Sequence, residues 1–138
     1  MEKNLNSLNK AIYLWGLIVG CMAEREEIER FLAEFKEKAR IFEIVFRPRD
    51  KNLQALAYLD ITAAKRLECI FNLKVEDYFA GPKGDTFDTA RPDYYEFGIQ
   101  VKGVELYVKI SKGLRNKPAD CMSFHPAEFR ISYPFKHA

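Results

Sequence analysis

The sequence predicts an α+β domain in which helices come first and an antiparallel sheet follows. Apolar residues recur at helical spacing over residues 23–40, and they alternate with polar residues from residue 94 onward. Lys102-Gly103 interrupts that alternation as a two-residue turn, with glycine where a positive φ is needed. The chain has 138 residues, of which 48% are hydrophobic, and this suits one globular domain with a real core.

The clearest helix covers residues 23–40. Its apolar residues form one stripe at a spacing of three and four positions: Ile28, Phe31, Leu32, Phe35 and Ala39. Acidic residues gather in its first turns and basic residues in its last turn, where each sign complements the helix dipole. We expect this helix to pack its apolar stripe on one face of the sheet.

Two shorter helices are expected before the sheet. Residues 52–59 predict a helix that turns three leucines inward: Leu53, Leu56 and Leu59. Thr62 is a suitable N-cap for a firmer helix over residues 63–73. The inner face of that second helix is expected to hold Ala64, Leu67, Ile70 and Phe71.

The remaining middle segments predict one strand and one long loop. Residues 41–46 are rich in β-branched and aromatic side chains, which favours a strand that Pro48 ends. Residues 76–93 contain Gly81-Pro82, Gly84 and Pro92, and they predict a loop. Long loops in small domains are often functional.

The tight turn sets the register of a hairpin made from residues 94–101 and 104–111. Val101 then faces Val104, and counting outward gives three further pairs on one face: Gln100 with Glu105, Gly98 with Tyr107, and Glu96 with Lys109. The opposite face is expected to be core and holds Tyr95, Phe97, Ile99, Leu106, Val108 and Ile110.

A third strand is expected over residues 120–125, followed by a further edge strand within 127–135. If Met122 and Phe124 face the core, Ser123 and His125 join the polar face of the hairpin. That face then gathers Glu96, Tyr107, Lys109 and His125, with Gln100 and Ser123 nearby.

These residue types suit cleavage of RNA without a metal. The reaction needs a base for the ribose 2′-hydroxyl, an acid for the leaving oxygen and a cation for the charge of the phosphorane. Glu96 or His125 is the candidate base, and His125 or Tyr107 is the candidate acid. Lys109 would hold the phosphate, and Gly98 opposite Tyr107 is expected to leave room for a ligand.

The same face also has a purely structural interpretation. Glu96 and Lys109 form an ordinary cross-strand ion pair on a solvated face, and Tyr107 covers Gly98. His125 then only ends its strand. The residues alone do not decide between the two interpretations.

Charge and cysteine content narrow the class of protein. A net charge of +2 excludes a polybasic protein that coats DNA. Three cysteines without C-x-x-C spacing argue against a zinc site and a disulfide framework, and they suggest a reducing compartment. Within residues 102–117, basic residues outnumber acidic ones. This basic segment either binds single-stranded RNA or protects the edge of the hairpin against aggregation.

Residues 1–21 read as an extension to a single domain over 22–138. A basic start and a ten-residue apolar run, 11–20, precede Cys21, which is a shape shared with lipoprotein signals. The run is too short to cross a bilayer. The alternatives are a true start at Met22 and a helix docked on the core.

Several segments resemble the MqsR-type toxins of type II toxin–antitoxin systems. They are LKVEDYFAGP at 73–82, Phe97-Gly98, VELYVKI at 104–110, CMSFHPAEF at 121–129 and YPFK at 133–136. The resemblance runs from about Glu24 to Lys136. It implies a RelE-like fold, with two main helices on one face of a short antiparallel sheet. It also implies a cytoplasmic mRNA interferase that uses no metal or other cofactor and is neutralised by a protein antitoxin.

The resemblance implies roles at matching positions. Tyr107 falls where the class carries a catalytic tyrosine, His125 where a functional basic residue sits, and Glu96 near a functional glutamine. Ala80 stands where a lysine is expected, and Lys83 is the candidate replacement. The candidate RNA-binding residues are Lys83, Lys102, Lys109 and Arg115.

Two other functions remain open from the sequence. One is a non-catalytic module of the same fold that binds RNA or protein. The other is a small lipoprotein anchored at Cys21. The toxin interpretation predicts mRNA as substrate, an antitoxin as partner and no association with a membrane.

Overall fold

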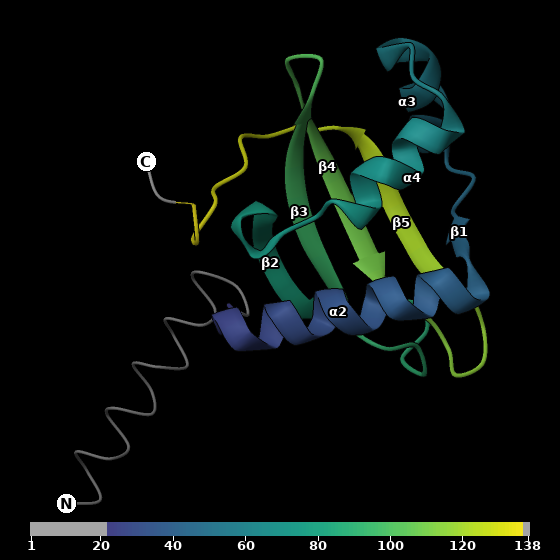
Figure 1. The fold of residues 1–138 in the computed structure, drawn as a ribbon, viewed down its shortest axis with the longest axis vertical. Helices are drawn as coiled ribbons and strands as arrows, with labels where there is room; N and C mark the ends of the chain where they lie inside the picture. Colours follow the sequence, from purple (N-terminus) through teal and green to yellow (C-terminus); the bar gives the residue numbers. More distant parts are fainter. Residues whose placement is uncertain (1–21, 137–138) are drawn as a thin grey trace, which may run out of the picture.

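The computed structural model describes residues 22–136, and the expectations for residues 1–21 lie outside this range. Figure 1 shows α2 and α4 in front of a twisted sheet, with α3 at the upper right. In chain order the elements are α2 (Arg25–Phe42), β1 (Ile44–Phe46), α3 (Asp50–Leu59), α4 (Ala63–Phe71), the 3-10 helix η1 (Val75–Asp77), β2 (Tyr78–Lys83), β3 (Tyr94–Val101), β4 (Val104–Ser111) and β5 (Ala119–Pro126). The α+β class is confirmed. None of the described helices has both the length and the apolar character needed to span a membrane.

The five strands form one mixed sheet in the order β1-β5-β4-β3-β2. Strands β2 to β5 pair antiparallel, whereas β1 pairs parallel with β5 and places Ile44 beside Ala119. The expectation of a purely antiparallel sheet is therefore wrong at this edge. Parallel pairing needs a long crossover connection, and two α-helices, η1 and three strands lie between β1 and β5 in the chain.

The predicted loop over residues 76–93 is wrong in its first part, because residues 78–83 form the edge strand β2. Pro82 is compatible with an edge position, where one side of a strand needs no donor. The predicted edge strand within 127–135 does not form. Instead this segment folds onto the sheet, where Ile131 N and the Tyr133 hydroxyl donate to the carboxylate of Glu105 at 3.3 and 2.9 Å.

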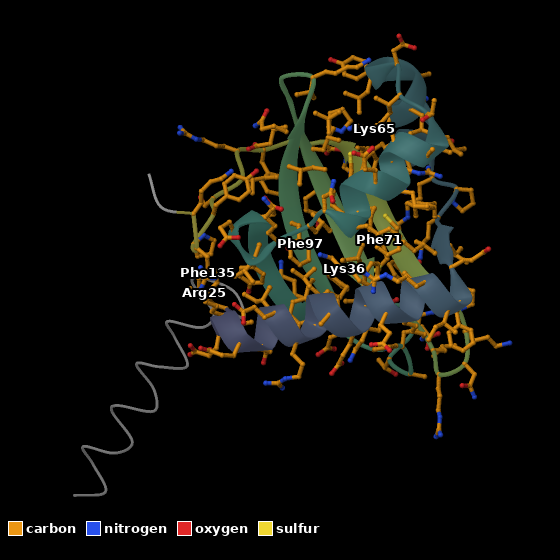
Figure 2. The ribbon with its side chains drawn as sticks, in the orientation of Figure 1. Arg25, Lys36, Lys65, Phe71, Phe97 and Phe135 are labelled. Carbon is orange, nitrogen blue, oxygen red and sulfur yellow. The ribbon has the colours of Figure 1, made fainter. Side chains whose placement is uncertain are left out.

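The core lies between α2 and the sheet, and the predicted stripe of α2 is buried in full. Phe31 stacks on Tyr95 with ring centroids 3.9 Å apart and lies 6.4 Å from Phe97. Lys36 donates to the carbonyl of Leu73 at 2.6 Å, which ties α2 to the end of the α4 segment (Figure 2). The helix continues to Phe42, so the strand is shorter than the predicted 41–46.

The inward faces of the two shorter helices differ from those predicted. In α3 the buried residues are Asn52, Ala55 and Leu59, whereas Leu53 is 60% exposed. The Asn52 side chain joins α3 to β5, because it donates to the carbonyl of Met122 and accepts from the N–H of Phe124.

In α4, the Thr62 cap is confirmed, since its hydroxyl accepts from Lys65 N at 3.0 Å. Ile70 is buried as predicted, but Ala64 and Leu67 are exposed. Arg66 is half-buried instead, with its guanidinium carbon 3.6 Å from the centroid of the Phe46 ring. A charged side chain covering an aromatic ring is invisible to a search for apolar periodicity.

The hairpin register is confirmed at every predicted pair, from Val101 with Val104 to Glu96 with Lys109. Both turn residues have positive φ, 52° at Lys102 and 78° at Gly103. Two successive positive φ values give the turn a twist that matches the right-handed twist of the two strands that it joins.

A β-bulge in β5 changes which side chains share its faces. Lys109 pairs with Ser123 but Ile110 pairs with Cys121, so Met122 is the extra residue. Cys121, only 1% exposed, therefore takes a core position that strict alternation would give to Met122. Asp120 pairs with Ser111 and so lies on the same face as Ser123 and His125. Strict alternation along the predicted strand 120–125 puts Asp120 on the core face with Met122 and Phe124, so this placement of Asp120 is wrong.

Candidate functional site

The sheet face opposite α2 and α4 brings together the four predicted site residues. Glu96 lies opposite Lys109 across β3 and β4, and Tyr107 lies opposite His125 across β4 and β5. These two pairs are adjacent on the polar face of three neighbouring strands. Ser123 pairs with Lys109 and completes this group.

The buried carboxylate of Glu96 connects strands β2, β3 and β4. Glu96 is 6% exposed, and it accepts a hydrogen bond from the Tyr107 hydroxyl on Oε1 and one from Lys83 Nζ at 2.9 Å on Oε2. Burial, followed by the hydrogen bond and charge of Glu96, raises the pKa of Tyr107 well above its usual range. Tyr107 is therefore a neutral phenol at physiological pH, with its proton directed at Glu96.

His125 lies beside Tyr107, with their ring centroids 5.6 Å apart. Its Nδ1 is 2.9 Å from the carbonyl oxygen of Pro126. A carbonyl oxygen only accepts hydrogen bonds, so this contact assigns a hydrogen to Nδ1. Nε2 is then the ring nitrogen that is left to contact a ligand.

Lys109 supplies a cation next to this group. Its Nζ lies 4.3 Å from the centroid of the Tyr94 ring. Burial lowers the pKa of Lys109; the charge of Glu96 opposes this effect, whereas Arg49, Arg47 and Lys83 reinforce it. Three further cationic side chains thus lie close enough to act on Lys109, and a cation in such surroundings favours the approach of an anion.

A second ionic cluster lies at the end of this face, and the sequence did not predict it. Asp120 accepts from Arg47 Nη2 at 2.7 Å and from Arg91 Nη1 at 3.1 Å. Arg47 also lies 3.8 Å from the Asp85 carboxylate. The hydrogen bond to Asp120 is the main cause that raises the pKa of Arg47. This cluster fixes the connection after β2 against β5 and β1.

The space beside Gly98 is not open, which corrects the expectation of room for a ligand there. A Cβ at this position would lie within contact of the Tyr133 hydroxyl and 2.8 Å from Ile131 Cδ1. The C-terminal segment therefore covers this part of the face. Tyr107, Lys109 and His125 stay partly exposed between that segment and the connection that follows β2.

The predicted RNA-binding lysines and arginine divide into two groups. Lys83 and Lys109 lie at the site. Lys102 donates to the carbonyl of Asp60 at 2.8 Å, at the tip of the hairpin. Arg115 is exposed in the loop that follows β4, beyond the end of that strand opposite to Lys102. Their contacts and positions do not join these two residues to the Tyr107 cluster.

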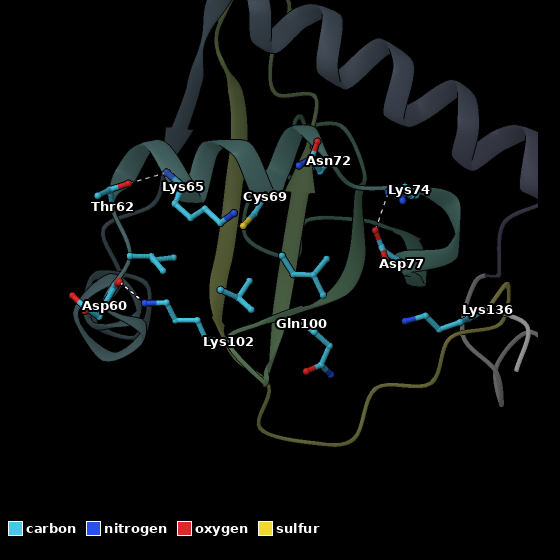
Figure 3. A pocket seen from close by; sticks show the side chains of 13 residues that line it. Asp60, Thr62, Lys65, Cys69, Asn72, Lys74, Asp77, Gln100, Lys102 and Lys136 are labelled. Carbon is cyan, nitrogen blue, oxygen red and sulfur yellow. Dashed lines mark hydrogen bonds between the residues drawn. The ribbon is translucent and has the colours of Figure 1, made fainter.

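Lys102 instead borders a hollow of about 920 Å³. Figure 3 shows it between α4, the hairpin and the C-terminal segment, with Lys65, Lys74 and Lys136 also at its rim. Ile99 and Val101 line it from the core face of β3, so this hollow lies on the opposite side of the sheet from Tyr107.

Searches against protein-family models, curated proteins and solved structures find no match to this chain. Among residues 22–136, no three His, Cys, Asp or Glu side chains form a group suited to hold a metal ion.

Proposed function

We propose that this protein is an endoribonuclease toxin of the MqsR type, which cuts mRNA through its own side chains. One observation supports this most directly. The Tyr107 hydroxyl is hydrogen-bonded to the buried Glu96 carboxylate, beside a histidine with a free Nε2 and beside two lysines. Base, acid and cation, the three groups that the reaction needs, thus occur within one small area.

The proposed reaction begins with the 2′-hydroxyl of the ribose. Its proton passes to the Tyr107 oxygen while the phenol proton passes to Glu96, which accepts it already through a hydrogen bond. O2′ bonds to phosphorus, the bond from phosphorus to O5′ breaks, and cationic His125 gives its Nε2 proton to O5′. The products are a 2′,3′-cyclic phosphate and a 5′-hydroxyl, so every proton is accounted for.

The raised pKa of Tyr107 is the reason for this assignment. A phenolate next to the Glu96 carboxylate would place two negative charges in contact, so Tyr107 is a poor acid on its own. Passing a proton through the hydroxyl avoids that charge. Lys109 and Lys83 then offset the negative charge that develops on the phosphorane.

The proposal extends to the fold family and the partner. Helix α2 packed on one face of a sheet that is antiparallel from β2 to β5 supports a RelE-like fold. The parallel strand β1 departs from an all-antiparallel sheet. From the resemblance we propose a protein antitoxin as partner and the cytoplasm as the place of action. Growth arrest on expression, relieved by the product of a neighbouring reading frame, tests both.

Cleavage of single-stranded RNA by the purified protein in EDTA tests the enzymatic proposal. Tyr107→Phe and His125→Ala are each expected to slow cleavage by about 10²- to 10⁴-fold, as for loss of a proton-transfer group. Ile41→Ala, at an exposed position of α2, is the control and should cut like the wild type. The 2′,3′-cyclic phosphate end is detected by mass spectrometry.

Two results would contradict the proposal in different ways. No cleavage of any RNA by the wild type, with antitoxin shown to be absent, favours the non-catalytic binding module. Cleavage that survives both substitutions shows an enzyme whose reacting groups lie elsewhere.

A further inference from the structure

Two hollows meet at His125, and helix α3 lines both. One, of about 310 Å³, is bordered by Arg49, Asp50, Lys51, Asn52, Ser123 and His125. The other, of about 360 Å³, is bordered by Lys51, Gln54, Ala55, Tyr58, His125, Pro126 and Glu128. Because His125 and Lys51 border both, the two hollows adjoin each other along α3, and together they are called the furrow below.

The two ends of this furrow differ in chemistry. The first carries the cations of Arg49 and Lys51 against the single carboxylate of Asp50. Lys51 also pairs with Glu128 at the rim, where both side chains are more than half exposed. A solvated pair of this kind is weak and exchanges readily for a phosphate.

The second end offers an aromatic surface. Tyr58 is 70% exposed, although it lies on a helix whose inner face is well packed. Ala55 and Pro126 provide apolar surface next to it, and Gln54 supplies a polar group at the edge. An exposed aromatic side chain next to a cationic groove is the usual surface on which proteins stack a base of single-stranded RNA.

We infer that this furrow is a nucleotide subsite flanking the cleavage centre, in which Tyr58 stacks one base of the RNA and Arg49 with Lys51 hold the adjoining phosphate. This inference rests on the proposed function for its substrate, since single-stranded RNA is the ligand in both. It adds a site that neither the sequence nor the catalytic group assigns. His125 borders both halves, so a strand in the furrow would contact the side chain that the proposed reaction uses.

The chemistry of the furrow selects RNA over a protein segment. One end of the furrow attracts a phosphate, and the adjoining end accepts a flat apolar group such as a base. Phosphates and bases alternate in this way along a nucleic-acid strand. Helix α3 can present Tyr58 and Lys51 to a ligand because its buried face holds it against β5. Asn52 is hydrogen-bonded to the backbone of β5 on both sides of Ser123.

Binding of a non-cleavable RNA, with 2′-O-methyl groups throughout and a fluorescein label, tests the subsite by anisotropy. Tyr58→Ala is expected to weaken binding about tenfold, from loss of one stacked base, and Tyr58→Phe to change it less than twofold. Leu53→Ala is the matched control, since Leu53 is exposed on the same helix and borders neither hollow. Arg49→Ala should weaken binding and flatten its salt dependence.

An abasic scan of the same RNA locates the stacked base. One abasic position should weaken binding to the wild type about tenfold and leave binding to Tyr58→Ala unchanged, because the base and the ring are lost together. Equal binding by Tyr58→Ala and the wild type would overturn the subsite even if the RNA is cut. Loss of binding in Tyr58→Ala, in a protein that cuts no RNA, would uphold the subsite and overturn the enzymatic proposal.

Discussion

The Tyr107 hydroxyl donates to one oxygen of the Glu96 carboxylate, whose other oxygen accepts from Lys83 at 2.9 Å. A phenol and an ammonium are thus joined through one buried anion. This arrangement keeps Tyr107 neutral and aligned, and it gives the phenol proton an acceptor on the protein. The proposed toxin function predicts an amide near this position, so the carboxylate is the feature of this chain that most affects the proposed mechanism.

Glu96→Gln tests whether the carboxylate accepts a proton. The amide still accepts the hydrogen bond of Tyr107 but cannot take up its proton, so we expect cleavage to fall by about 100-fold or more. With the charge removed, the pKa of Tyr107 should move down toward its usual range. Both are measurable, the first by RNA cleavage and the second by ultraviolet titration of the tyrosines against Tyr107→Phe.

Glu34→Gln serves as a control for this substitution, since the Glu34 carboxylate pairs with Lys112 at an exposed position of α2. It should alter neither the cleavage rate nor the tyrosine titration. Full cleavage by a folded Glu96→Gln protein would show that Glu96 only positions Tyr107, as an amide also can.

The local part of the fold followed from the sequence. A two-residue turn with glycine in second place fixes the register of its strands, so Glu96, Gly98, Tyr107 and Lys109 were placed correctly. Strand β2 was missed because Gly81 and Pro82 resemble a loop when the neighbouring strand is unknown. The parallel pairing of β1 was missed because it joins segments far apart in the chain.

The site was predicted as far as the hairpin register extends. His125 was placed correctly beside Tyr107 because strict alternation holds from Ser123 to His125. The bulge at Met122 breaks the alternation, so Asp120, which precedes it, was assigned to the wrong face. Gly98 was expected to leave room for a ligand because the path of the C-terminal segment depends on contacts that no local pattern encodes. The ion pairs of Arg47 were missed because they join it to Asp85 and Asp120, which lie far from it in the chain.

The Asp120 cluster predicts a loss of stability on substitution. Asp120→Ala leaves Arg47 and Arg91, both partly exposed, without their shared acceptor. We expect the free energy of unfolding to fall by roughly 1–3 kcal/mol, with water screening part of the cost. Urea unfolding followed by circular dichroism measures it, and Glu34→Gln at an exposed pair should show little change. An unchanged midpoint for Asp120→Ala would mean that the cluster adds nothing to stability.

Gly98 predicts a specific steric coupling to the C-terminal segment. Gly98→Ala forces its new methyl group against Tyr133 and Ile131, and we expect a loss of about 1–3 kcal/mol, typical of overpacking. Limited proteolysis should then cut residues 127–136 sooner. In a double-mutant cycle, Tyr133→Ala should reduce the cost of Gly98→Ala, because it removes the nearest atoms. Additive costs would show that the segment does not lie against Gly98 in solution.

Tyr95 predicts how stability declines in alkali. Its hydroxyl donates to Glu27 at 3.3 Å, and burial, with the Glu27 charge, raises the pKa of Tyr95 to about 12. An unfolded tyrosine ionises near pH 10. Between about pH 10 and 12 the unfolded chain therefore releases a proton that the folded chain keeps. The contribution of Tyr95 is complete below pH 10 and is lost as the pH rises toward 12.

Tyr95→Phe removes this titration, so its free energy of unfolding should fall less steeply than that of the wild type between pH 9.5 and about 11.5. Glu27→Gln should have the same effect in smaller measure, because it removes only one cause of the raised pKa. Some slope persists in both, since burial also raises the pKa of Tyr94, Tyr107 and Tyr133. Urea unfolding at a series of alkaline pH values measures the slopes. Identical slopes for the wild type and Tyr95→Phe would mean that Tyr95 ionises as readily in the folded protein as in the unfolded chain.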